Sequence, residues 1–114
     1  MSTTATGRAA EAAAAQFLEY KGCHIVARNW RTRECEIDIV AERGGIIYFC
    51  EVKYRKTTHQ GDGLAYITPK KLRQMHFAAR QWMATHDRRQ GYRLSAIAVA
   101  GPFYRITAAI ADVQ

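Results

Sequence analysis

The chain has 114 residues, of which 48% are hydrophobic and 24% are charged. This length suits one domain with a single core. The composition is close to the globular average, which excludes disordered and fibrous chains. No apolar run approaches the ~20 residues of a spanning helix, which excludes a membrane-spanning chain. Seventeen Lys and Arg against ten Asp and Glu give a net charge of +7, and twelve of the seventeen are Arg, whose planar guanidinium suits phosphate. We therefore expect a single domain over residues 1–114, with a flexible end over residues 1–6, and a polyanionic partner.

The predicted elements begin with an Ala-rich helix over residues 7–21. A strand is expected over residues 23–30, and β-branched and aromatic residues predict two more strands over 36–41 and 46–53. The Gly44-Gly45 dipeptide between the last two is typical of a hairpin turn.

A polar loop is expected over residues 57–65. Thr68 and Pro69 then predict the start of a helix, because Thr caps helices and Pro is tolerated in the first helical turn. Two further strands are expected over residues 92–100 and 103–110. The sequence therefore predicts an α/β fold, in which helices flank a central mixed sheet of about five strands and the order is α-β-β-β-α-β-β.

The hairpin determines which residues face each other. A two-residue turn at Gly44-Gly45 places Val40 across from Phe49 and Asp38 across from Glu51. In this register Asp38 and Glu51 share one face with Glu36 and Lys53, and neighbouring Cβ atoms are roughly 5 Å apart. A slip by one residue would send the two acids to opposite faces.

Two carboxylates that face each other repel, so a purely structural sheet gains nothing from this pair. A divalent cation removes the conflict, because Mg²⁺ is typically held by one or two carboxylates together with waters and substrate phosphate. Lys53 could then orient an attacking water or stabilise charge on the phosphate. The alternative is a solvent-facing strand pair with two cross-strand charge contacts, and the residues alone leave both interpretations open.

Glu11 borders the apolar stripe of the first helix and could point inward, at the acidic edge of the sheet. The residues alone favour another interpretation, a surface carboxylate near a helix start that is stabilised by the helix dipole.

Basic residues flank the acids in the sequence, and several could reach a phosphate backbone. They are Arg28, Arg31, Arg33, Arg55, Lys56, Lys70, Lys71 and Arg73. Trp30 and Tyr54 could stack on a splayed base, although aromatic residues in strands belong more often to the core.

The three Cys and four His show no zinc-binding spacing and no Cys-x-x-Cys pair. Free thiols fit a reducing compartment, and we expect a cytoplasmic protein.

Five ordered motifs carry a resemblance to a known family. They are Gly7-Arg8-x-x-Glu11, Ala27-Arg28-Asn29-Trp30-Arg31, Glu36-Ile37-Asp38-Ile39-Val40, Glu51-Val52-Lys53-Tyr54-Arg55 and Ile67-Thr68-Pro69-Lys70-Lys71. The chain resembles the bacterial YraN-type uncharacterised protein family, over about residues 7–100. That family is similar to archaeal Holliday-junction resolvases and to nucleases of the restriction-endonuclease-like PD-(D/E)xK fold. The resemblance implies this fold.

The resemblance also implies roles for single residues. Asp38 and Glu51 would be ligands of Mg²⁺ or Mn²⁺, with the Val52 carbonyl as a further ligand. Lys53 would be the catalytic lysine, and Glu11 the helical acid that completes the site. Cys35 departs from the family pattern, which usually has Gly before Glu-Ile-Asp. If that Gly permits a positive φ, Cys35 would change how the strand starts.

The leading hypothesis is a metal-dependent endonuclease that hydrolyses phosphodiester bonds in DNA, with branched or junction DNA as a candidate substrate, and the residues do not distinguish DNA from RNA. Resolvase-like enzymes commonly pair across a two-fold axis, so the resemblance also implies a homodimer. One alternative is a nucleic-acid-binding accessory protein on the same fold without useful catalysis. Another is an interaction domain whose basic face meets an acidic protein.

Overall fold

The N-terminal segment forms a helix because it is rich in alanine. In the computed structural model, which describes residues 5–57 and 64–113, helix α1 spans Ala5–Tyr20 and buries Ala10, Glu11, Ala14 and Ala15. Of the end predicted to be flexible over residues 1–6, Ala5 and Thr6 belong to α1, and residues 1–4 lie outside the described part.

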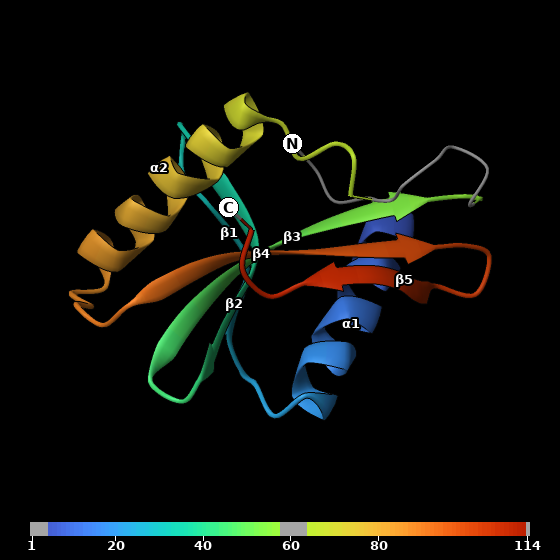
Figure 1. Cartoon of the computed structure of the whole chain (residues 1–114), viewed down its shortest axis with the longest axis horizontal. Helices are drawn as coiled ribbons and strands as arrows, with labels where there is room; N and C mark the ends of the chain where they lie inside the picture. Colours follow the sequence, from blue (N-terminus) through green and yellow to red (C-terminus); the bar gives the residue numbers. More distant parts are fainter. Residues whose placement is uncertain (1–4, 58–63, 114) are drawn as a thin grey trace.

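Five strands form one sheet (Figure 1). They are β1 (His24–Arg31), β2 (Glu36–Arg43), β3 (Ile46–Arg55), β4 (Tyr92–Ala100) and β5 (Arg105–Ile110). The strands lie in chain order, and neighbours are antiparallel except β3 and β4. That parallel pair requires a crossover, which helix α2 (Pro69–Thr85) supplies. The predicted mixed sheet and the order α-β-β-β-α-β-β are confirmed.

Turn chemistry sets the ends of several elements. Gly44 and Gly45 both have positive φ angles, of 58° and 78°, as a tight hairpin turn requires. Thr68 caps α2 by accepting a hydrogen bond from the Lys71 backbone at 3.1 Å. The last strand starts at Arg105 rather than at residue 103, because the turn after β4 continues through Tyr104. Residues 58–63 of the loop predicted over 57–65 lie outside the described part.

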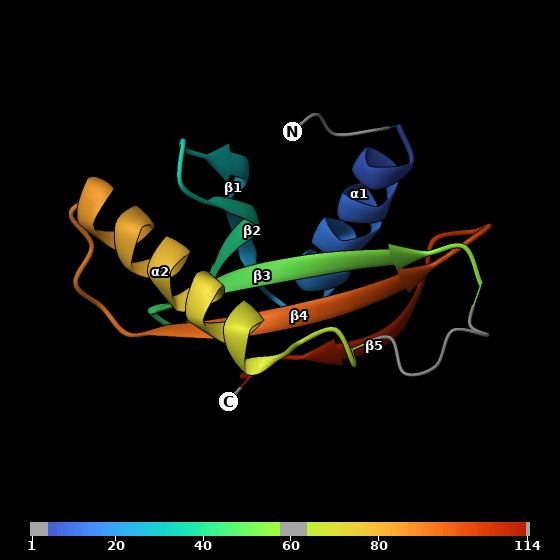
Figure 2. The ribbon, with the colours of Figure 1, turned by 90° about the horizontal axis from the view of Figure 1, so that it is seen from above.

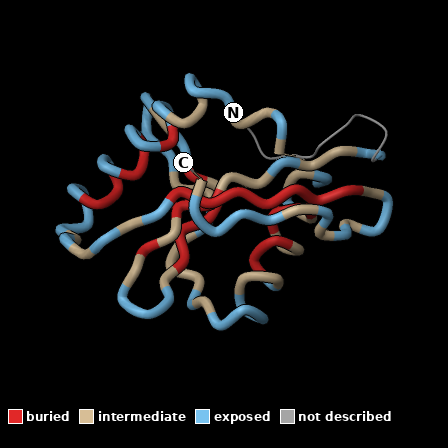
Figure 3. The backbone as a smooth tube through the Cα atoms, viewed as in Figure 1, coloured by how far each residue is buried: buried red, intermediate tan, exposed pale blue. Residues whose placement is uncertain are grey.

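The two helices cover opposite faces of the sheet (Figure 2). On one face, Ala10 and Ala14 of α1 pack with Ile39 and Ile97. On the other face, α2 packs a different set of core residues, which includes Phe49, Met75, Trp82 and Leu94. The buried residues follow β4 from Leu94 to Ala100 and only the first half of β3 (Figure 3). Neither helix of the described part is long and apolar enough to cross a membrane.

The β2–β3 hairpin has the predicted register over only part of its length. Val40 lies across from Phe49, as predicted, but the described ladder ends at the pair Ile39–Cys50. Beyond this point β3 continues beside β4 as far as Arg55, while β2 leaves it. The prediction that Asp38 pairs with Glu51 in the ladder is therefore wrong. We call the place where the two strands separate, at Asp38, Glu51 and Val52, the fork.

Candidate functional site

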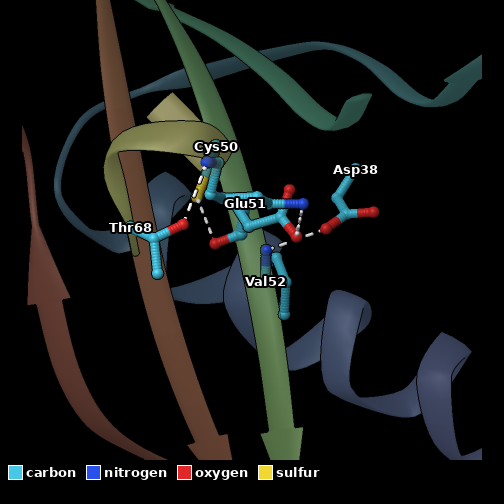
Figure 4. A network of polar contacts seen from close by, with 6 residues as sticks. Asp38, Cys50, Glu51, Val52 and Thr68 are labelled. Carbon is cyan, nitrogen blue, oxygen red and sulfur yellow. Dashed lines mark hydrogen bonds and ion pairs between the residues drawn. The ribbon is translucent and has the colours of Figure 1, made fainter. Parts of the chain in front are cut away.

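Asp38 occupies the fork, and its side chain replaces a ladder bond. Its Oδ2 accepts a hydrogen bond of 2.8 Å from the Val52 backbone N–H (Figure 4). The pKa of Asp38 is raised to about 7, first by burial and then by the negative charge of Glu51, and the Val52 hydrogen bond opposes this rise. The two carboxylates are thus close enough to interact electrostatically, although they do not pair in the sheet.

Glu11 approaches the same place from α1. Its side chain is buried, with 7% of the residue exposed, so the interpretation as a surface carboxylate is wrong. Burial raises the pKa of Glu11, whereas the Asn29 side chain and the charge of Arg28 lower it. The negative charge of Glu11 in turn helps to raise the pKa of Asp38. Its Oε1 has no hydrogen-bond partner among residues 5–57 and 64–113. The fork therefore collects negative charge from both faces of the sheet.

Glu51 has a cationic neighbour that the sequence did not assign to it. Lys71 Nζ lies 3.1 Å from Glu51 Oε2, which forms a salt bridge between α2 and β3. Lys53, the lysine expected beside Glu51, is exposed, and its Nζ lies 5.7 Å from the centre of the Tyr66 ring. The structure thus places Lys71 next to Glu51, and the catalytic role of Lys53 stays a prediction.

The donor atoms at the fork suit a hard divalent cation. Within the described ranges, no group of three or more His, Cys, Asp and Glu side chains is arranged to hold a metal ion. Mg²⁺ does not need such a cage, because it usually keeps several waters and takes one or two carboxylates. The N–H and C=O of a strand residue point to the same edge, so the Val52 carbonyl faces the fork beside Asp38. The residues present therefore fit the cation that the resemblance implies.

A groove leads away from Glu51 between the β1–β2 turn and α2. It has a volume of about 740 Å³ and is lined by three acids, Glu34, Glu36 and Glu51, and by a majority of the predicted phosphate-binding residues. These are Arg31, Arg33, Lys70, Lys71 and Arg73. We call this feature the basic groove.

The other three predicted bases lie elsewhere. Burial raises the pKa values of Glu11 and Tyr66, and the charges of Arg28 and Arg55, respectively, oppose these rises. Lys56 follows the end of β3. The aromatic residues suggested for base stacking, Trp30 and Tyr54, pack against the two core clusters, as aromatic strand residues usually do.

Sequence reasoning missed two residues that the structure places at the site. Phe77 lines the basic groove, with 40% of the residue exposed. The sequence feature that could have indicated this exposure is the position of Phe77, an aromatic residue that does not fall on the apolar stripe of α2. Asn29 reaches Glu11 and has a positive φ of 55°, and its signal was an asparagine within a β-prone segment.

Cys35 does not need the conformational freedom of glycine. It is not among the residues with positive φ in the described part of the chain, and it closes a short turn in which the Thr32 N–H donates to the Cys35 carbonyl at 2.8 Å. The Thr32 hydroxyl accepts hydrogen bonds from the backbones of Glu34 and Cys35. Replacement of the usual Gly therefore leaves the start of β2 in ordinary backbone geometry.

The sequence is similar to proteins of one known family. The profile described as "Uncharacterised protein family UPF0102" matches residues 10–99, which include the fork and Glu11. A UPF0102 protein of Leifsonia xyli is 44% identical over 94 residues, which cover 82% of this chain and 80% of the relative. A UPF0102 protein of Parafrankia is 42% identical over 80 residues, which cover 70% of this chain and 68% of the relative. A UPF0102 protein of Neisseria meningitidis serogroup C is 51% identical over 67 residues, which cover 58% of this chain and 57% of the relative. These names state a family and no activity.

Proposed function

The chain belongs to the uncharacterised protein family UPF0102, and we propose that it is a nuclease that uses Mg²⁺ or Mn²⁺ to hydrolyse phosphodiester bonds in DNA. One observation carries the proposal. Buried or partly buried carboxylates from α1, β2 and β3 converge at the fork, and one of them, Glu51, also lines the basic groove. A sheet that served only structure would be destabilised by such a concentration of negative charge.

Asp38, Glu51 and the Val52 carbonyl are the groups that would hold the cation. The chemistry that a divalent cation supplies is neutralisation of charge on a phosphate and a lower pKa of water. Lys53 would stabilise negative charge that develops on the phosphate. Glu11 would complete the site from the α1 side, where its carboxylate is already buried.

The basic groove supplies the contacts to the substrate. Arg31, Arg33 and Arg73 offer planar guanidinium groups along it, and these bind phosphate oxygens well. Phosphate contacts carry no information about the base, so cleavage at a defined sequence is not expected. Branched DNA is the substrate that the resemblance to resolvases suggests, and a homodimer would present two such sites to two strands.

The test is a cleavage assay on labelled branched and linear DNA with Mg²⁺ or Mn²⁺. The wild-type protein is compared with Asp38→Ala and Glu51→Ala from parallel preparations. We expect cleavage by the wild type alone. Equal cleavage by the variants would identify a contaminating nuclease and would remove the support for this function.

A second function has its own supporting observation. Lys71 already neutralises Glu51, and a site filled by an internal salt bridge suits a protein that binds nucleic acid without cutting it. Such an accessory protein would bind DNA with steep salt dependence and would show no metal-dependent cleavage in the same assay.

An interaction domain for an acidic protein would instead bind its partner in the presence of competing DNA.

A further inference from the structure

Lys71 stands between the two parts of the candidate site. The salt bridge that joins its Nζ to Glu51 Oε2 at 3.1 Å leaves 31% of the Lys71 side chain and 22% of the Glu51 side chain exposed. Both side chains line the basic groove, and Glu51 also belongs to the fork. Any ligand that enters the groove therefore meets Lys71 while Lys71 is bound to a carboxylate of the fork.

The position of Lys71 in the helix is fixed and is unfavourable for the helix itself. The Thr68 cap accepts a hydrogen bond from the Lys71 backbone, so this residue belongs to the first turn of α2. That turn contains no acidic residue, although the N-terminus of a helix carries a partial positive charge that acids would balance. Lys70 and Lys71 add to this positive charge, so helix stability does not explain why two lysines stand here. The carboxylates that line the basic groove give these lysines negative partners.

Lys71 and a divalent cation would compete for the carboxylate of Glu51. The ammonium group of Lys71 neutralises charge on Glu51 that would otherwise attract a divalent cation. Lys71 also has three N–H donors on a flexible stem, so it can turn from Glu51 to a phosphate in the same groove.

We infer that Lys71 is a positioning residue that couples substrate binding to cation binding. With the groove empty, Lys71 holds Glu51 and weakens the affinity of the fork for a cation. A phosphate group in the groove draws Lys71 away, and Glu51 is released toward the fork. Cation and phosphate therefore strengthen each other's binding through this one side chain. The inference rests on the proposed function in that Glu51 is taken as a cation ligand.

The first test measures the binding of Mn²⁺ alone. The electron paramagnetic resonance signal of the free ion reports how much Mn²⁺ is bound. Removal of the Lys71 charge in Lys71→Gln should tighten Mn²⁺ binding roughly two- to fivefold, the range expected for a partly exposed ion pair. Lys71→Arg keeps the charge and should bind Mn²⁺ with an affinity close to that of the wild type. Lys70→Gln is the matched control, since Lys70 lines the same groove without the salt bridge, and it should change Mn²⁺ affinity less than Lys71→Gln does.

The second test measures the coupling itself. Anisotropy of a labelled phosphorothioate oligonucleotide, which keeps the negative charge of DNA, gives its affinity with and without Mn²⁺. Mn²⁺ should tighten oligonucleotide binding to the wild type and to Lys70→Gln by the same factor, whereas this factor should be severalfold smaller in Lys71→Gln, where only the direct attraction between cation and phosphate remains. Lys70→Gln should bind the oligonucleotide more weakly at every Mn²⁺ concentration.

The outcomes separate this inference from the proposed function. If Mn²⁺ binds the wild type but not Asp38→Ala, and Lys71→Gln behaves as the wild type in both tests, the fork holds a cation and the coupling through Lys71 is wrong. If the wild type binds no Mn²⁺, the cation site and the coupling are both wrong. Circular dichroism of each variant verifies that α2 is still folded.

Discussion

Asp38 Oδ2 lies 2.8 Å from the Val52 backbone nitrogen, so a side chain of β2 occupies the position where the β2–β3 ladder would otherwise continue. The hydrogen bond ties a partly buried carboxyl to the strand that carries Glu51. Because the strands separate here, the carboxyl lies between β2 and β3, beyond the end of their ladder. This relationship between Asp38 and Val52 is the basis of the candidate site.

The raised pKa of Asp38 predicts how stability depends on pH. A carboxyl whose pKa rises on folding from 3.8 to about 7 binds more protons in the folded than in the unfolded chain. Its contribution to stability is therefore present at acidic pH and is lost as the pH rises from about 4 to about 7. Asp38→Asn keeps an oxygen for the Val52 N–H and removes the charge. We expect it to stabilise the protein at pH 8 by roughly 2 kcal/mol, and not at pH 4.

Urea unfolding of both proteins at pH 4 and pH 8 measures this difference. Asp87→Asn is a suitable control, since Asp87 is exposed and pairs with the exposed Arg89. An Asp38→Asn protein that is no more stable than the wild type at pH 8 would contradict the prediction.

Glu11→Gln should have opposite effects on stability and on cation binding. The buried Glu11 carboxyl has a raised pKa and an Oε1 without a hydrogen-bond partner in the described part, so loss of its charge should increase the melting temperature by a few degrees near pH 8. The same change should weaken Mn²⁺ binding severalfold, because negative charge leaves the fork. Thermal melts and Mn²⁺ titrations test both effects. Glu19→Gln, at an exposed position of the same helix, should change neither.

Divalent cations should stabilise the folded protein in a way that depends on pH. Mn²⁺ binds only the folded arrangement of Asp38 and Glu51, so it should raise the melting temperature, and EDTA should reverse the rise. A proton on Asp38 competes with the cation, so the rise should be larger at pH 8 than at pH 6. Calorimetric scans at both pH values measure it. A rise of equal size in Asp38→Ala would show that Mn²⁺ binds elsewhere.

Arg73→Ala should weaken DNA binding, and Arg80→Ala should not. Both arginines are exposed on α2, but only Arg73 lines the basic groove. Loss of one phosphate contact should lower the slope of log affinity against log salt by about one. Fluorescence anisotropy over a range of salt concentrations gives this slope. Equal slopes for the two variants would mean that DNA does not occupy the groove.

Local signals in the sequence were sufficient to predict most of the fold. Gly44-Gly45 determined the turn and with it the register from Arg43–Ile46 to Ile39–Cys50, and Thr68 with Pro69 marked the start of α2. These features depend on residues that are close in the sequence, which is why pattern and propensity predict them.

The details of the site depend on contacts between distant residues. Alternation along β2 predicts a continuous ladder, and it cannot show that the Asp38 side chain takes the N–H of Val52. The pairing of Lys71 with Glu51 requires the packing of α2 on the sheet, which brings together residues 20 positions apart. The burial of Glu11 likewise follows from the way α1 lies on the sheet.

The location of a bound Mn²⁺ ion tests the central claim most directly. Crystals grown with Mn²⁺ and measured at a wavelength with strong manganese anomalous scattering would reveal each bound ion. We predict one strong anomalous peak at the fork, within coordination distance of the Asp38 carboxylate, the Glu51 carboxylate and the Val52 carbonyl. A fork without a peak at saturating Mn²⁺, with Lys71 still on Glu51, would contradict the account.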